Sequence, residues 1–286
     1  MNYYKNKFEN YENFNVLETN KPFLLTDSEQ KDWDADSYVR QIYFTTPNIK
    51  KMNVFCLITF RPNKIWCDFL NLFNKYKIFI IVDDNNFDLS DFKKNYNNIT
   101  FKQIEEIECI NHGFKDTNFM INKLVSGWDK ALYYFSIEYK DYEFIWFMED
   151  DVFFFNENTI IKIDNQYIND DLLSNKYGVN INGNRYTWHW WRINIRDTPP
   201  YYNGMMCAVR FSKNMIKCII DYASKNETLF FLEALFPTIA IKNNLKYNNP
   251  VEFNNIHYRY DFEKKNINDT DLYHPVKKLN DHLYFR

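Results

Sequence analysis

The sequence predicts an α/β protein with a central mixed, mostly parallel sheet flanked by helices. A strand at 54–60, a helix at 65–73 and a strand at 78–82 follow one another within about thirty residues. This order is typical of a βαβ unit, whose strands pair in parallel inside a covered sheet. A further apolar run at 144–148 stops abruptly at three acidic residues. We therefore expect a covered sheet with one strand that carries acid at its tip.

The remaining elements are predicted from apolar spacing and from turn residues. After the βαβ unit come a weaker strand at 100–104 and a helix at 119–139. The region 164–204 has little periodicity and is predicted to be irregular, as is the tail from residue 250. Between them the pattern predicts a strand at 205–211 and helices at 213–224 and 229–241. Residues 1–50 have no pattern of their own and form a predicted N-terminal extension to a domain at 51–286.

Composition excludes several classes of function. The chain has 286 residues and a net charge of −3, without a run of Lys and Arg, so we expect no nucleic-acid partner. No apolar run approaches the roughly 18 residues of a membrane span, and the first twenty residues do not resemble a signal peptide, so a cytoplasmic location is expected. The five cysteines include no Cys-x-x-Cys pair and are expected to be reduced. Glycine motifs for dinucleotides and the P-loop are absent from the sequence.

The acidic triplet Glu149, Asp150 and Asp151 is the strongest functional signal. Three adjacent carboxylates repel one another, so a nearly buried segment carries them only where solvent or a cation compensates the charge. Mg²⁺ and Mn²⁺ bind carboxylate oxygens and are often shared with substrate phosphates. The alternative is an acidic turn between two buried strands. The flanking residues are too apolar for a surface loop, which favours a metal and diphosphate site at the end of a central strand.

Six short segments, taken in order, resemble the GT-A class of nucleotide-sugar glycosyltransferases over roughly residues 53–278. They are Ile-Thr-Phe-Arg-Pro at 58–62, Ile-Val-Asp-Asp at 81–84, the acidic triplet, Asn-Gly-Met-Met at 203–206, Phe-Leu-Glu-Ala at 231–234 and Tyr-His-Pro-Val-Lys at 273–277. The resemblance implies a Rossmann-like GT-A domain, with a nucleotide-binding half at 51–155 and an acceptor-binding half at 156–286. It also implies Mn²⁺ or Mg²⁺ as the cofactor.

The resemblance further implies a donor site. In this site the nucleoside would be contacted by Thr59, Arg61 and Asp83 or Asp84, and the ribose or the water shell of the metal by Glu149 and Asp150. The metal would be bound by Asp151 and His274, and a phosphate would be contacted by Lys277. The first acid is Glu where the family more often has Asp. Other interpretations stay open: the Asp83 and Asp84 pair as turn residues, His274 as a structural histidine and Lys277 as an exposed lysine.

The acceptor half supplies a candidate catalytic base, Glu233, which lies among apolar residues that would raise its pKa. Asp221 and Glu227 are weaker candidates, and Glu233 could instead face solvent. The resemblance places acceptor-binding loops at Trp188, Trp190, Trp191 and Tyr202, whose rings could stack on sugars or could belong to the core.

The predicted function is metal-dependent transfer of a sugar, with inversion slightly favoured. The expected donor is a nucleoside-diphosphate sugar, for which the resemblance favours UDP, and the expected acceptor is a glycan or protein hydroxyl. A nucleotidyltransferase is one alternative, because it would use similar acids and a metal. A non-catalytic glycan-binding or structural protein on the same fold is the other.

Overall fold

The computed structural model describes residues 53–118, 123–184 and 198–286. In this part of the chain one sheet has seven strands, in the order β3 (Ile99–Lys102), β2 (Tyr76–Val82), β1 (Asn53–Thr59), β4 (Phe144–Glu149), β6 (Tyr201–Ser212), β5 (Leu172–Asn180) and β7 (Tyr247–Asn248). The pairs β3–β2, β2–β1, β1–β4 and β5–β7 are parallel, whereas β6 is antiparallel to both β4 and β5. The predicted mixed, mostly parallel α/β sheet is confirmed.

The first βαβ unit forms as its sequence predicts. α3 (Lys64–Leu70) begins after Asn63, whose side chain accepts a hydrogen bond from the amide of Trp66 and so caps the helix. Successive side chains of β1 then point to opposite faces of the sheet. Phe55 and Leu57 belong to one apolar core, and Cys56 to the other. Both faces of β1 are therefore buried.

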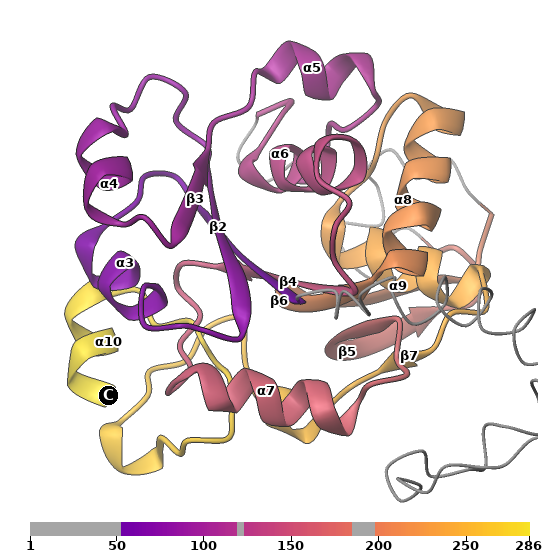
Figure 1. Cartoon of the computed structure of the whole chain (residues 1–286). Coiled ribbons are helices and arrows are strands. Elements are labelled where there is room, and N and C mark those ends of the chain that lie inside the picture. The colour runs from indigo at the N-terminus through magenta and orange to yellow at the C-terminus, as the bar shows by residue number, and fades with distance from the viewer. Residues whose placement is uncertain (1–52, 119–122, 185–197) are drawn as a thin grey trace, which may run out of the picture. The chain divides into compact units, whose positions relative to one another are not determined.

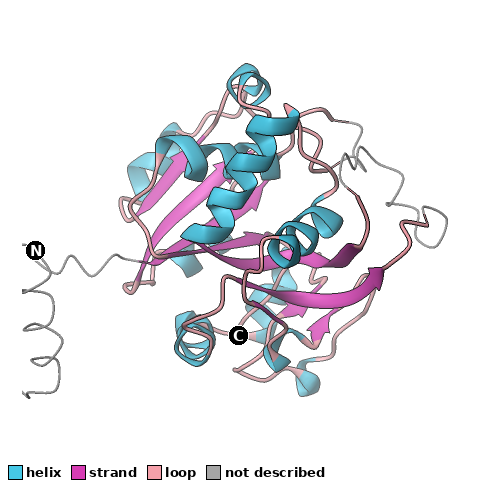
Figure 2. Ribbon diagram, turned by 90° about the vertical axis from the view of Figure 1, so that its right-hand side faces the viewer, coloured by secondary structure: helices cyan, strands magenta, loops and turns pink. Residues whose placement is uncertain are grey.

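Helices cover both faces of the sheet (Figures 1 and 2). One core contains residues of α5 (Glu106–Asn111), α6 (Gly127–Tyr133), the π-helical turn η2 (Tyr134–Glu138), α8 (Lys213–Asn226) and α9 (Leu232–Lys242). The other core contains residues of α3 and α7 (Glu157–Gln166). The remaining elements are α4 (Ser90–Asn95), α10 (Leu279–Phe285), η4 (Val251–Phe253), η5 (Lys264–Asn266), and the two-stranded parallel sheet of β8 (Asn255–Ile256) and β9 (Tyr273–His274).

A buried charged network fixes β6 to its neighbours. Asp164 of α7 accepts hydrogen bonds from Trp146 Nε1 at 3.0 Å and from Arg210 Nη1 at 3.1 Å, and also from the hydroxyl of Tyr76. The Arg210 side chain is fully buried. Because an unpaired buried charge is costly, this network holds β2, β4, β6 and α7 in one arrangement.

Three sequence predictions were wrong in their details. The helix predicted at 119–139 begins only at Gly127, because Ser126 and Asp129 form a capping box there. The region predicted to be irregular contains β5, whose pairing with β6 shifts register twice, so its alternation is hidden in the sequence. The tail from residue 250 contains β8, β9 and α10.

Two other predictions lie outside the described residues. They concern the N-terminal extension at 1–50 and the aromatic segment at 186–191. None of the helices that the structure describes is both long enough and apolar enough to cross a membrane.

Candidate active site

The carboxyl ends of three parallel strands meet at one edge of the sheet. Thr59 of β1 pairs with Val82 of β2, and Ile58 pairs with Glu149 of β4. Ligands of open α/β sheets bind at such an edge. An open cleft of about 200 Å³ lies there, lined by Ile58, Thr59, Phe60, Asp83, Asn118, Ser126, Gly127, Trp128, Glu149, Asp150 and Asp151.

The three acids of the triplet take part in two separate sets of contacts. Glu149 and Asp151, two residues apart, form a group with His274 in which one ligand atom from each lies within 4.8 Å of the others. Asp150 takes part in different contacts: its carboxylate accepts a hydrogen bond from the hydroxyl of Thr59, and its carbonyl accepts one from Trp66 Nε1 at 2.8 Å. β4 ends at Glu149, and Asp150 and Asp151 lie in a turn in which the amide of Val152 donates to the carbonyl of Glu149 at 3.2 Å.

The C-terminal tail brings His274 to the acids. β9 pairs with β8, and Nδ1 of His274 is hydrogen-bonded to the carbonyl of His257 at 2.6 Å. This contact orients the other ring nitrogen, Nε2, which lies 3.3 Å from Oδ1 of Asp151. The amide of Val276 donates to the carbonyl of Asp151 at 2.7 Å. The backbone on both sides of the histidine is therefore tied to neighbouring structure.

The residues of this group fit a divalent cation. Oδ1 of Asp151 is buried and accepts no well-formed hydrogen bond from any residue that the structure describes. Such an oxygen is costly to bury without a positive partner. Two carboxylates and one oriented imidazole are a donor set that Mn²⁺ accepts.

The pKa values at the site reflect burial of like charges. Burial raises the pKa of Glu149 to about 7, and the carboxylate of Asp151 adds to the rise, whereas Trp128 Nε1, which donates to Glu149 at 2.6 Å, opposes it. Burial also raises the pKa of Asp150, against the hydrogen bond from Thr59. Burial lowers the pKa of His274, but the Asp151 carboxylate outweighs it, so the pKa is raised overall. The site thus holds excess negative charge.

Glu233 lies in the first turn of α9 and within electrostatic range of this group. Burial raises its pKa to about 8; the carboxylate of Glu149 adds to the rise and His274 opposes it. The same charges act on Cys207 of β6. Burial raises the pKa of its thiol, and the charges of Glu149, Asp151 and Glu233 add to the rise. The helix that carries Glu233 therefore faces the acidic end of β4.

On the β2 side of the cleft, lysines that sequence reasoning missed hold Asp83. Its Oδ1 lies 2.8 Å from Nζ of Lys123 and 3.2 Å from Nζ of Lys130, and its carbonyl accepts from Lys130 at 2.6 Å. The Lys130 side chain is fully buried. The only indication of this arrangement in the sequence was that Lys130 lies among apolar positions of the helix predicted at 119–139. Asp84 pairs with Nε of Arg61 at 2.7 Å, and the hydrogen bond from Arg61 lowers the pKa of Asp84.

Gly127 allows α6 to approach this edge closely. A Cβ atom at Gly127 would lie 2.8 Å from Cγ2 of Ile58 and 3.4 Å from Cβ of Asp83. The Ile58 methyl group belongs to a stiff β-branched side chain and cannot move away easily. The residue that appeared to weaken a predicted helix instead places Trp128 beside Glu149.

The other predicted residues stand apart from the acid group. Lys277 is exposed and forms no ion pair with another described residue. Tyr202 is half-buried on β6, and its amide donates to Oγ1 of Thr238 at 2.9 Å. Trp188, Trp190 and Trp191 lie outside the described residues.

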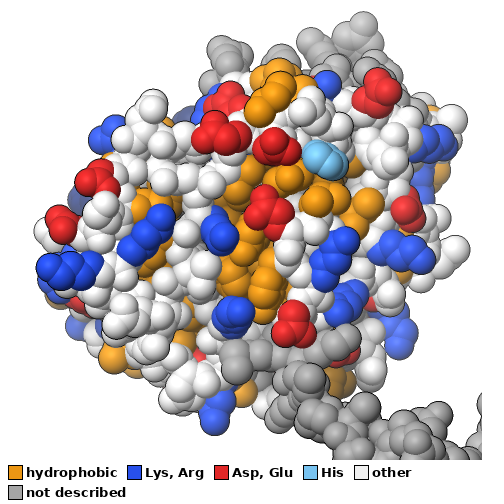
Figure 3. All heavy atoms as spheres, turned by 45° about the horizontal axis from the view of Figure 1, so that its top comes forward, with side chains coloured by type: hydrophobic (Ala, Val, Ile, Leu, Met, Phe, Trp, Pro, Cys, Tyr) orange, Lys and Arg blue, Asp and Glu red, His pale blue; other side chains and the backbone are white. Residues whose placement is uncertain are grey.

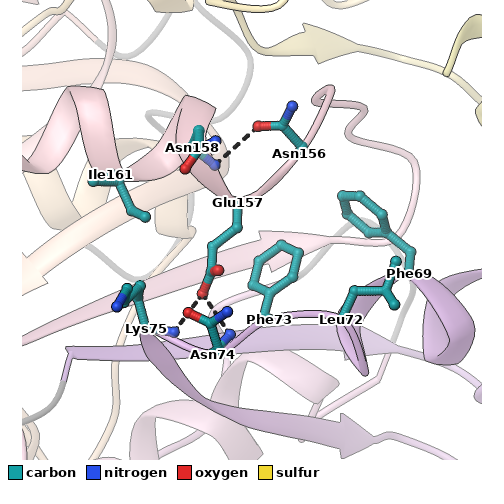
Figure 4. Close-up of a pocket in the computed structure, with 9 residues that line it drawn as sticks. All are labelled: Phe69, Leu72, Phe73, Asn74, Lys75, Asn156, Glu157, Asn158 and Ile161. Carbon is teal, nitrogen blue, oxygen red and sulfur yellow. Dashed lines mark hydrogen bonds between the residues drawn. The ribbon is translucent and has the colours of Figure 1, made fainter.

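A second cavity, of about 430 Å³, is lined by none of the predicted site residues that the structure describes (Figure 4). It lies between the end of α3 and the start of α7. Glu157 points into it and accepts hydrogen bonds from the amides of Asn74 and Lys75, at 3.0 and 2.7 Å. Those contacts give Glu157 a structural role.

The charged side chains on one face of the molecule are mixed in sign (Figure 3). On the face turned forward in Figure 3, basic and acidic side chains alternate around an apolar strip. That face has no continuous basic patch of the kind that binds nucleic acid.

No protein-family model matches this sequence, and no curated protein matches it. Among solved structures, the chain is similar to 4-diphosphocytidyl-2C-methyl-D-erythritol synthase from Anaerococcus prevotii, with 10% identity and a TM-score of 0.42 over 83% of this chain and 96% of that one. It is also similar to mouse xyloside xylosyltransferase 1, with 8% identity and a TM-score of 0.34 over 69% of this chain and 85% of that one.

Proposed function

We propose that this chain is a metal-dependent glycosyltransferase. Its donor would be a nucleoside-diphosphate sugar, with UDP as the favoured nucleotide, and its acceptor a hydroxyl group of a glycan or protein. The observation that carries the proposal is the group of Glu149, Asp151 and His274 at the carboxyl end of β4, beside a cleft between parallel strands. Two of these residues are partly buried acids that repel each other until a cation is present.

The nucleoside would bind on the β1 and β2 side of the cleft. Carboxylates accept hydrogen bonds from ribose hydroxyls and from the N–H groups of a base. Lys123 and Lys130 hold the carboxylate of Asp83 in place, and Arg61 does the same for Asp84. In this proposal the cations orient the two acids, and the hydroxyl of Thr59 orients Asp150.

The diphosphate would bind at the acid and histidine group. Asp151 and His274 would hold the cation with Glu149, which takes a larger part than the sequence alone suggested. The imidazole favours Mn²⁺ over Mg²⁺, which prefers all-oxygen sites. A bound divalent cation would neutralise the charge that develops on the leaving diphosphate. Lys277, three residues after His274, would add a positive charge near the terminal phosphate.

Glu233 would act as the base of an inverting transfer. The acceptor oxygen forms a bond to the anomeric carbon as the bond from that carbon to the phosphate oxygen breaks, and the acceptor proton passes to the Glu233 carboxylate. The raised pKa of Glu233, about 8, makes it a stronger base than an ordinary carboxylate. A positive charge at the adjacent group would increase the fraction that is deprotonated at neutral pH.

Nucleotidyl transfer requires attack at the α-phosphate and usually uses free basic side chains or glycine-rich backbone near the phosphates. After β1 the first two cations are Arg61, which already pairs with Asp84, and Lys64, which already pairs with Asp68. This observation favours glycosyl transfer.

Analysis of the reaction products distinguishes glycosyl transfer from nucleotidyl transfer. We would incubate the protein with Mn²⁺ and a panel of nucleotide sugars, and follow phosphorus NMR signals. Glycosyl transfer to water or an acceptor predicts nucleoside diphosphate and no pyrophosphate. A second incubation, with nucleoside triphosphates and sugar phosphates, should release no pyrophosphate. Pyrophosphate in that incubation would support the nucleotidyltransferase, and no reaction in either would support a non-catalytic protein.

A further inference from the structure

We propose that a cavity beside the acid and histidine group binds the acceptor as an uncharged saccharide; this inference rests on the function proposed above. The cavity has a volume of about 700 Å³, within the range of roughly 300–1,000 Å³ that is typical of ligand sites. It is lined by Arg259, Tyr260, Asp261, Phe262, Pro275, Val276, Lys277, Lys278, Asp281 and Phe285. Tyr202, the predicted acceptor residue that the structure describes, is not among them.

Both walls of this acceptor cavity are formed by chain segments that adjoin His274, one along the sequence and one through the pairing of β8 with β9. One wall begins at the next residue, Pro275, and its Val276 amide is bonded to the carbonyl of Asp151. The other wall continues from β8, where Ile256 pairs with His274 and the carbonyl of His257 is hydrogen-bonded to the His274 ring. A ligand in the cavity would therefore lie next to the residues that we assign to the diphosphate, which a transferase requires.

An aromatic cluster forms one side of the cavity. Tyr260 is 49% exposed, and its ring centroid lies 4.7 Å from that of Phe262 and 5.0 Å from that of His257. Phe262 in turn contacts the buried ring of Tyr273 at 5.2 Å. A half-exposed ring that packs on two partly buried rings, one of which contacts the buried Tyr273, offers a rigid apolar surface. The apolar face of a pyranose ring can stack on such a surface.

The polar side chains at the cavity lack partners within the described chain. Arg259, Asp261, Lys277 and Lys278 line it, yet none of their side chains forms a hydrogen bond or ion pair with any residue of 53–118, 123–184 or 198–286. Carboxylate and guanidinium groups accept from and donate to adjacent hydroxyls.

The charges at the cavity distinguish a neutral ligand from an anion. Asp261 and Asp281 place two carboxylates among the three cations. With Lys277 assigned to the diphosphate, Arg259 and Lys278 are balanced by Asp261 and Asp281, so the remaining side chains give an acidic ligand no net attraction, whereas hydroxyl groups can bond to both signs. The mixture therefore favours an uncharged saccharide.

Binding of simple glycosides tests the proposal directly. The probes are methyl α- and β-glycosides of common hexoses and pentoses at millimolar concentration, and saturation-transfer NMR with titration measures binding. We expect at least one glycoside to bind the full-length protein. Tyr260→Ala should weaken that affinity by about tenfold or more, because the stacking surface is lost, and Asp261→Asn should weaken it as well. The control is Tyr284→Ala, which removes a more exposed ring of α10 outside the cavity and should bind as wild type does.

The outcomes separate this proposal from the proposed function. Thermal unfolding within about 2 °C of wild type would confirm that each variant is folded. If no glycoside binds, or if Tyr260→Ala and Asp261→Asn both bind as wild type does, the acceptor cavity is refuted, whether or not nucleotide sugars are hydrolysed. If glycosides bind as expected but no nucleotide sugar is turned over, the cavity stands and the transferase proposal fails.

Discussion

Nε2 of His274 lies 3.3 Å from Oδ1 of Asp151, so the last strand of the chain meets the acidic motif at the end of β4. The histidine ring is oriented from behind by the carbonyl of His257. An imidazole fixed in this way points one nitrogen at a carboxylate oxygen that has no well-formed hydrogen bond within the described chain. The pair is arranged as two ligands of one ion are arranged.

The first prediction concerns metal affinity. Replacing Asp151 by Ala, or His274 by Ala, removes one ligand, and we expect the affinity for Mn²⁺ in calorimetry to fall by about 100-fold or more. His112→Ala is the control, since this exposed histidine at the end of α5 lies outside the group. Unchanged Mn²⁺ affinity in either ligand variant would show that the ion binds elsewhere.

A second prediction separates two buried tryptophans that both donate to a carboxylate. Trp128 Nε1 bonds to Glu149 at 2.6 Å, and Trp146 Nε1 bonds to Asp164 at 3.0 Å. Each change to Phe removes a hydrogen bond to an acid and should cost about 1.5–3 kcal/mol of stability where that acid stays charged. Only Trp128→Phe should also change Mn²⁺ affinity, because Asp164 belongs to the structural network. Equal Mn²⁺ affinities in the two variants would contradict a role of Trp128 in orienting Glu149.

The third prediction follows from the raised pKa of Glu233. Its ordinary value is 4.5 and its value in the fold is about 8, so the folded state binds the proton more tightly. Stability should therefore fall as pH rises from about 4.5 to about 8. Glu233→Gln removes this dependence, and without metal it should exceed wild type by at least about 1 kcal/mol at pH 9 while losing the advantage at pH 5.

The same variant should lose transfer activity at all pH values. Asp221→Asn, at an exposed carboxylate of α8, is the matched control and should keep both the pH profile and the activity of wild type. Thermal unfolding across pH and nucleotide release provide the two measurements. Full activity in Glu233→Gln would remove it as the base.

The fourth prediction compares the adjacent acids after β2. Asp83→Asn leaves the buried ammonium of Lys130 without its carboxylate and should cost about 2–4 kcal/mol, although contacts to the Asp83 carbonyl and to Asn85 remain. Asp84→Asn breaks an exposed pair with Arg61 and should change stability little. Chemical denaturation measures both. A large loss in Asp84→Asn alone would reverse our assignment of the structural acid.

Much of the fold could be predicted because its signals are local. The βαβ unit shows continuous apolar strands around a helix of clear period, and both edges of that pattern are sharp. The end of β4 is equally clear, since Met148 is followed at once by Glu149. These features place the carboxyl ends of strands at one edge, and hence the acids.

The parts that could not be predicted depend on distant contacts. Lys123 and Lys130 acquire their roles only because Gly127 lets α6 approach Asp83. β5 is stabilised by pairing with β6 through two register shifts, which erase the alternation that identifies a strand. The aromatic residues at the acceptor cavity, Tyr260 and Phe262, lie in a tail that the sequence predicts to be irregular. Their rings pack on each other and on Tyr273 of β9, and not along a helix or a long strand, so no periodic pattern marks them.

The central claim is that Glu149, Asp151 and His274 hold a metal that in turn holds a nucleoside diphosphate. Calorimetric binding of UDP in the presence of Mn²⁺ and in EDTA, to wild type and to Asp151→Ala, tests it most directly. The account predicts binding only by wild type with Mn²⁺. Equal binding in EDTA, equal binding by Asp151→Ala, or no binding of UDP or any other nucleoside diphosphate with Mn²⁺ would contradict it.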